Sequence, residues 1–131
     1  MGNDDCCLNE LYQTIDDTFS YLRKKWTIPI IKGLFSGCKN FKGFLELNPG
    51  LSSKVLAERL KELEENGIVE KIVLNSSAGH TEYYLTDKGL RLNKIIFEMF
   101  NFALDEVLRN ESSSKLKEDS KEDLRVCLKM K

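Results

Sequence analysis

The sequence of 131 residues has one histidine, two prolines and four cysteines, and each shortage excludes a class of protein. The single histidine, His80, has no Cys-x-x-Cys pair beside it, so no ligand set for a structural zinc ion is present. The cysteines are irregularly spaced in a chain long enough to bury its own core, which favours reduced thiols over a disulfide framework. We therefore expect no metal and no cofactor.

Long apolar runs and enzyme motifs are also missing. No stretch approaches the roughly eighteen apolar residues that cross a bilayer. The acidic N-terminus lacks the basic and apolar regions of a signal peptide. A phosphate-binding Gly-Lys-Ser/Thr loop and a Gly-x-Ser-x-Gly elbow are absent as well. The sequence thus predicts a cytoplasmic protein that is not an enzyme and has no membrane partner.

An excess of one charge is lacking too, because 20 basic residues balance 21 acidic ones. The charge is nevertheless unevenly distributed. Residues 1–22 carry five acids and no base, whereas residues 23–61 carry nine bases against two acids, a local charge of +7. A basic stretch within a chain of low net charge is typical of a nucleic-acid-binding surface.

Hydrophobic periodicity predicts a mainly helical α+β chain. Apolar residues at steps of three and four predict helices over residues 8–22, 27–35 and 41–47. A further helix is expected to open at Leu51-Ser52-Ser53 with a serine N-cap, and to end at Asn66-Gly67-Ile68.

A β-hairpin is expected next, since residues 68–74 and 81–85 are β-branched runs joined by a polar tip. Thr86 is expected to cap one long final helix that reaches about Arg109. Residues 110–131 are polar and charge-mixed, which predicts an extension that is disordered or marginally helical.

The long final helix has apolar residues on more than one face, too many for a small domain to cover. A second chain is the economical partner, and the amphipathic helix of residues 8–22 is available for the same interface. We therefore predict a homodimer, with its contacts drawn from both helices: Leu11, Ile15, Phe19, Ile96, Phe97, Phe100 and Leu104.

The predicted order of helices, turn and hairpin is that of a winged helix-turn-helix, in which the helix after the turn enters the major groove. Three segments make the similarity specific, namely Lys25-Trp26-Thr27-Ile28, the stretch from Asn48 to Glu70, and Glu82-Tyr83-Tyr84-Leu85-Thr86-Asp87-Lys88-Gly89. Together they resemble the HxlR-type family of prokaryotic winged-helix transcriptional regulators, relatives of the MarR group.

The resemblance covers about residues 23–90, the predicted DNA-binding domain. It implies a dimer that binds double-stranded DNA at an inverted-repeat operator and regulates transcription. Residues 1–22 and 91–109 then form the dimerisation helices, and residues 110–131 form a polar extension. Two features depart from the family pattern: Asn40 replaces a common arginine, and the tip of residues 76–80 is not basic.

The candidate DNA-binding residues lie on the recognition helix and around it. Short hydroxyls at a capped helix N-terminus allow close approach to phosphate, and Lys or Arg reaches phosphates or guanine edges. Each lysine or arginine has the alternative of being a plain solvated charge. The predicted set is Ser52, Ser53, Lys54, Ala57, Arg59 and Lys61 on the helix, with Lys25, Lys39, Lys42 and His80 around it.

Cys6 and Cys7 admit two interpretations. They are either inert thiols near the chain terminus or, as the resemblance implies for a cysteine ahead of the first helix, a sensor of oxidants or electrophiles. The neighbouring acids would raise a thiol pKa, which favours the inert alternative.

The function predicted from the sequence is a homodimeric, sequence-specific DNA-binding transcriptional regulator, responsive to oxidants if Cys6 or Cys7 is a sensor. The alternative is a winged-helix module that binds proteins and has lost its DNA site. The basic stretch favours the first function, whereas Asn40 and the neutral wing favour the second.

Overall fold

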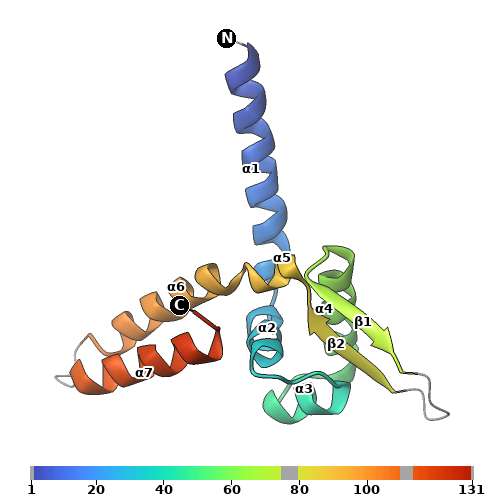
Figure 1. The fold of residues 1–131 in the computed structure, drawn as a ribbon, viewed down its shortest axis with the longest axis vertical. Coiled ribbons are helices and arrows are strands. Elements are labelled where there is room, and N and C mark those ends of the chain that lie inside the picture. The colour runs from blue at the N-terminus through green and yellow to red at the C-terminus, as the bar shows by residue number, and fades with distance from the viewer. Residues whose placement is uncertain (1, 75–79, 110–113, 131) are drawn as a thin grey trace.

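The structure is a computed structural model, and it describes residues 2–74, 80–109 and 114–130. The side chains of residues 2–6 and 114–117 lie outside that description. Its elements are α1 (Gly2–Leu22), α2 (Thr27–Phe35), α3 (Phe41–Leu47), α4 (Ser53–Glu65), β1 (Val69–Val73), β2 (Thr81–Leu85), α5 (Asp87–Leu90), α6 (Asn93–Val107) and α7 (Ser114–Cys127). Figure 1 shows a winged helix-turn-helix body with helices projecting from it, which confirms the predicted fold class.

The body is built from α2, α3, α4 and the hairpin. Side-chain caps set two of the helix starts: Asn40 Oδ1 accepts from Gly43 N at 2.7 Å before α3, and Ser52 Oγ accepts from Val55 N at 3.1 Å before α4. The buried apolar side chains of these elements form one core that includes Ile30, Ile31, Phe44, Leu56, Leu60, Leu63 and Ile68. The helices of the helix-turn-helix and the start of the hairpin therefore share one hydrophobic core.

The hairpin pairs β1 with β2 antiparallel, with Val69 opposite Leu85 and Val73 opposite Thr81. Thr86 ends the hairpin and caps α5, as predicted, because its hydroxyl accepts from Gly89 N at 3.1 Å. The same hydroxyl donates to the carbonyl of Gly67 at 2.5 Å, which fastens α5 to the end of α4. These two hydrogen bonds hold the end of β2 against the C-terminal end of α4 and the start of α5.

The prediction of one long final helix was wrong, since Arg91 and Leu92 separate α5 from α6. The reason is a contact far away in sequence. A Cβ on Gly89 would lie 2.3 Å from the carbonyl oxygen of Ile68, so α5 is pressed against the start of the hairpin. The chain turns after it, and α6 then takes a direction of its own (Figure 1).

Of the two alternatives left open for the C-terminal extension, the structure has the helical one, because α7 is a helix of 14 residues that packs beside α6 (Figure 1). Leu128 is fully buried in the core, and the guanidinium of Arg125 lies 5.2 Å from the centre of the Phe97 ring. Most residues of α7 are charged, so the composition of this segment did not indicate that Leu128 packs into the core.

The covering by α7 changes the predicted dimer contacts. Ile96 and Phe97 are buried inside the chain itself, so in this fold they are not available to a second copy, contrary to our prediction. Phe100 and Leu104 are half-buried. The apolar side chains that α6 leaves exposed are instead Ile95, Met99, Phe102 and Val107.

Helix α1 stands away from the rest of the molecule (Figure 1). Among the side chains of α1 that the structure describes, residues 7–22, those buried in the core are Tyr21 and Leu22 at its end. Its apolar stripe is exposed along the preceding turns, and Phe19 reaches 64% exposure, with Leu8, Leu11, Tyr12 and Ile15 also exposed. No helix in the described ranges is long and apolar enough to cross a membrane.

Candidate nucleic-acid interface

The outer face of α4 is polar, basic and open at its N-terminal half. Ser53, Lys54, Ala57 and Lys61 are all exposed, and Ser52 is exposed at the cap. Within the described ranges neither lysine forms an ion pair, and the first turn of α4 contains no acid. Lys54, Ala57 and Lys61 recur at steps of three and four, so the two ammonium groups lie on one side of α4, while the uncapped amide hydrogens point out of its N-terminal end; both features attract phosphate.

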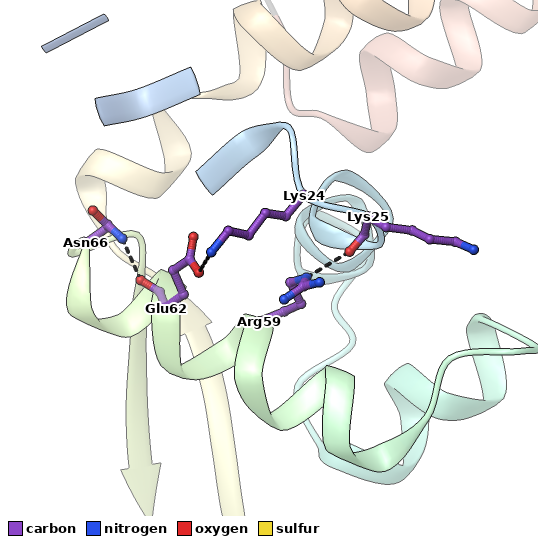
Figure 2. A network of polar contacts seen from close by, with 5 residues as sticks. All are labelled: Lys24, Lys25, Arg59, Glu62 and Asn66. Atoms are coloured by element: carbon purple, nitrogen blue, oxygen red, sulfur yellow. Dashed lines mark hydrogen bonds and ion pairs between the residues drawn. The ribbon is translucent and has the colours of Figure 1, made fainter. Parts of the chain in front are cut away.

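Arg59 differs from the other residues predicted on this helix. It is half-buried, and its Nε donates to the backbone carbonyl of Lys25 at 2.8 Å (Figure 2). One turn further along α4, Glu62 pairs with Lys24, with 2.5 Å between Nζ and Oε2. Arg59 and Glu62 therefore connect α4 to the segment between α1 and α2.

Lys25 contributes its carbonyl to this connection and keeps its ammonium group exposed. Its Nζ lies 5.5 Å from the centre of the Trp26 ring, within the range of a cation–π contact. Trp26 is half-buried, its ring beside Gly50, and its backbone is left-handed with a φ of 78°. That conformation is rare for a bulky residue, and no local sequence pattern predicted it.

A groove of about 520 Å³ runs between α3 and the hairpin. Lys42 and His80, both predicted, line it together with Asn40 and Tyr83. Lys71 lines it as well, exposed on β1 and opposite Tyr83 in the hairpin register. Lys71 was not predicted, and no alternation along residues 69–73 identifies it, because every residue of β1 after Val69 is exposed.

Lys39 is the least free of the predicted cations. Its ammonium lies 3.6 Å from Glu82, which also accepts a hydrogen bond from the Tyr84 hydroxyl. That hydroxyl and Lys39 together hold the pKa of the Glu82 carboxyl below its usual value, and the carboxylate raises the pKa of Tyr84. Lys42 has only a loose partner, Glu46, at 3.9 Å on the exposed surface.

The thiols lie in unlike surroundings. Cys7 is exposed on α1, and the side chain of Cys6 lies outside the described part of the chain. Cys38 is half-buried after α2, and burial raises its pKa. Cys127 Sγ lies 3.1 Å from Ser36 Oγ, so α7 meets the end of α2 there. Where side chains are described, no three His, Cys, Asp or Glu residues are grouped as metal ligands.

Comparison with known proteins agrees with this geometry. The model of the family described as HxlR-like helix-turn-helix matches residues 21–111. The HTH-type transcriptional regulator YodB of Bacillus subtilis is 43% identical over 103 residues, which cover 79% of this chain and 87% of YodB. YvaP, an uncharacterized HTH-type transcriptional regulator of the same organism, is 35% identical over 97 residues, 74% of this chain and 90% of its own.

Solved structures show the same fold. The reduced form of YodB superposes with a TM-score of 0.64 and covers 70% of this chain and 90% of YodB. YodB has also been solved diamide-treated and quinone-bound. The redox regulator HypR in its reduced form gives a TM-score of 0.65 at 28% identity, over 74% of this chain and 94% of HypR. This chain belongs to the HxlR-like helix-turn-helix family of transcriptional regulators.

Proposed function

We propose that this protein is a homodimeric transcriptional regulator that reads an inverted-repeat operator by placing α4 in the major groove. The observation that carries the proposal is the open outer face of α4, where Ser53, Lys54, Ala57 and Lys61 are exposed beside a serine cap. Lys54 and Lys61 have the length to reach phosphates or guanine edges, and the small Ala57 allows close approach.

The groove between α3 and the hairpin extends the same surface. Lys42 and Lys71 line it beside His80, so two further ammonium groups are available to the phosphate backbone of a duplex held by α4. Lys39 contributes less because Glu82 lies 3.6 Å from its ammonium group. These contacts position the protein, whereas base recognition falls to the exposed residues of α4.

The dimer part of the proposal rests on the exposed apolar faces of two projecting helices. Leu11, Ile15 and Phe19 form a stripe on α1, and Ile95, Met99 and Phe102 are exposed on α6. Apolar stripes of this length are costly in water and are covered when two copies pair about a twofold axis. The twofold axis then gives the operator its inverted-repeat symmetry.

A response to thiol oxidants is a second proposed function. It is supported by exposed Cys7 on the proposed dimer helix, and by relatives that have been solved in reduced, oxidised, diamide-treated or quinone-bound forms. Treatment with diamide is expected to change operator affinity in the parent protein and not in the Cys6→Ser/Cys7→Ser double variant. An equal response in both proteins would leave these thiols inert.

Fluorescence anisotropy with the DNA upstream of the protein's own gene, at several salt concentrations, tests the proposed function. The logarithm of the association constant should fall linearly with log salt, by roughly 0.9 per neutralised phosphate. Lys54→Ala should flatten the slope by about one unit per subunit if Lys54 holds a phosphate. If it reads a guanine, discrimination should relax by about 1–3 kcal/mol while the slope is retained.

Arg109→Ala is the matched control, because it also removes one positive charge, and Arg109 is exposed just after α6. It should bind DNA as the parent does. Binding no tighter than to random duplex, with Lys54→Ala equal to the parent, would reject the regulator and favour a protein-binding module.

A further inference from the structure

Two polar contacts join α4 to the segment between α1 and α2. The Lys24 ammonium lies 2.5 Å from the Glu62 carboxylate, and Arg59 Nε donates to the Lys25 carbonyl at 2.8 Å (Figure 2). Arg59 and Glu62 are three residues apart and so lie on one side of α4. Two adjacent residues of one segment thus hold two successive turns of the helix that we propose enters DNA.

The segment that receives these contacts has little freedom of its own. Only four residues separate α1 from α2, and Thr27 N donates to the Lys24 carbonyl at 3.2 Å. Trp26 is fixed in a left-handed conformation with its ring beside Gly50. At the other end, Tyr21 and Leu22 anchor α1 in the core. A shift of α1 therefore carries residues 24 and 25 with it.

The contacts are too weak individually to serve mainly as stabilisers of the fold. The Lys24 side chain is 42% exposed and that of Glu62 is 24% exposed, and ion pairs in such surroundings add little to stability. The core beneath α4, made by Leu56, Leu60 and Leu63, holds the helix on the body without them. What the contacts do is join one side of α4 to residues 24 and 25, which directly follow the end of α1.

We propose that Arg59 and Glu62 are positioning residues which, through Lys25 and Lys24, couple the orientation of the recognition helix to α1 and so set the half-site spacing that the dimer accepts. This rests on the proposed function, in which α1 pairs with a second copy and α4 reads a half-site. Arg59 then acts through the carbonyl of Lys25 rather than as a phosphate contact.

Charge offers a sharp discrimination between positioning and simple electrostatics. Lys24→Gln removes a positive charge and Glu62→Gln removes a negative one. If these groups acted only through the field around DNA, the first change would weaken binding and the second would strengthen it. If they position α4, both changes weaken binding to the operator of preferred spacing, and the exchange Lys24→Glu/Glu62→Lys restores it.

The experiment measures anisotropy binding of the full chain to a set of operators whose half-sites are moved apart or together by one and two base pairs. The parent should prefer one spacing by about tenfold or more. Lys24→Gln and Glu62→Gln should each lose about threefold in affinity at that spacing and gain at its neighbours, and Arg59→Gln should lose about tenfold. The salt slope should stay that of the parent, because no phosphate contact is removed.

Glu106→Gln serves as the control, since it removes a carboxylate from the Arg109–Glu106 pair within α6. It should leave the spacing preference unchanged, and circular dichroism should show every variant folded. Affinities of Lys24→Gln and Glu62→Gln that move in opposite directions, or an Arg59→Gln slope lower by about one unit per subunit, would overturn the inference. Failure of the parent to bind any operator would refute the proposed function instead.

Discussion

The winged-helix body and the helices that flank it satisfy their apolar residues in different ways. In the body, Phe44, Leu56 and Ile68 are fully buried in the core of the chain. In α1, Leu11, Ile15 and Phe19 are more than half exposed. The body is thus complete as one chain, whereas α1 presents an apolar surface that a second copy is proposed to cover.

The C-terminal helices lie between these two extremes. One side of α6 is covered by α7 and by Leu128, and the other side leaves Ile95 and Phe102 exposed. The chain therefore covers only one side of α6 itself. An apolar helix face predicted from sequence indicates that the face is buried, but it does not indicate whether the same chain or a second copy buries it.

The strongest way to test the comparison is to remove one phenylalanine ring from each region. Phe44→Ala should destabilise the chain by ~3–5 kcal/mol, because the ring is fully buried and its loss leaves a cavity. Phe19→Ala, at an exposed position, should change the stability of the monomer by less than about 0.5 kcal/mol. Urea denaturation at low protein concentration measures both, and equal losses would contradict the contrast.

Leu128→Ala tests whether the segment that includes α7 contributes to the stability of the chain. Leu128 is fully buried although it lies in the last few residues of the chain, so we expect a loss of ~2–3 kcal/mol, near the lower end for a leucine because a terminal segment can relax. Val126→Ala is the control, since Val126 is 72% exposed two residues away. Thermal unfolding measures both variants, and midpoint temperatures equal to that of the parent would show that α7 and Leu128 add nothing to stability.

Ile15→Glu tests whether α1 is a dimer face. A charge within a desolvated contact should weaken the dimer by about 2 kcal/mol or more, roughly thirtyfold in the dissociation constant, and leave a folded monomer. Ser20→Glu adds the same charge at an exposed polar position of α1 and should leave the dimer intact. Sedimentation equilibrium distinguishes these outcomes, and a parent that is monomeric at micromolar concentration would refute the dimer.

Phe97→Glu, by contrast, should unfold the chain rather than release monomers. Phe97 is buried against the chain's own Arg125 guanidinium, so the substitution places a carboxylate in the core instead of in an interface. Sequence periodicity alone placed Phe97 and Ile15 in the same interface. The covering helix α7 separates the two cases.

The sequence predicted the body well because its boundaries depend on local chemistry. Ser52 and Thr86 are caps, and Gly67 takes a positive φ of 73° at the end of α4. The break after α5 depends on the approach of Gly89 to the Ile68 carbonyl, a contact between residues 21 positions apart that no local pattern contains.

The candidate site was predicted in the same uneven manner. The exposed face of α4 follows from helical periodicity, so Lys54, Ala57 and Lys61 were placed correctly on the outer side. The inward turn of Arg59 depends on where the Lys25 carbonyl lies, and that depends on the left-handed Trp26. A contact of this kind depends on the three-dimensional fold, so a local sequence pattern does not predict it.

The smallest expected effect compares one thiol of each region. Burial raises the pKa of Cys38 in the body, and Cys7 is exposed on α1. Because the thiolate is the reactive form, a raised pKa lowers the reactive fraction at any given pH, and burial also hinders access. We expect iodoacetamide at pH 8 to modify Cys7 several times faster than Cys38, and the rate at Cys38 to keep rising at a pH where an ordinary thiol has levelled off.

Peptide mass spectrometry in the Cys6→Ser background follows both sites, and urea supplies the control, since unfolding removes the burial and should bring the two rates together. Equal rates in the folded protein would show that Cys38 is as accessible as a residue on the projecting helix, and the contrast between a closed body and an open α1 would fail at that position.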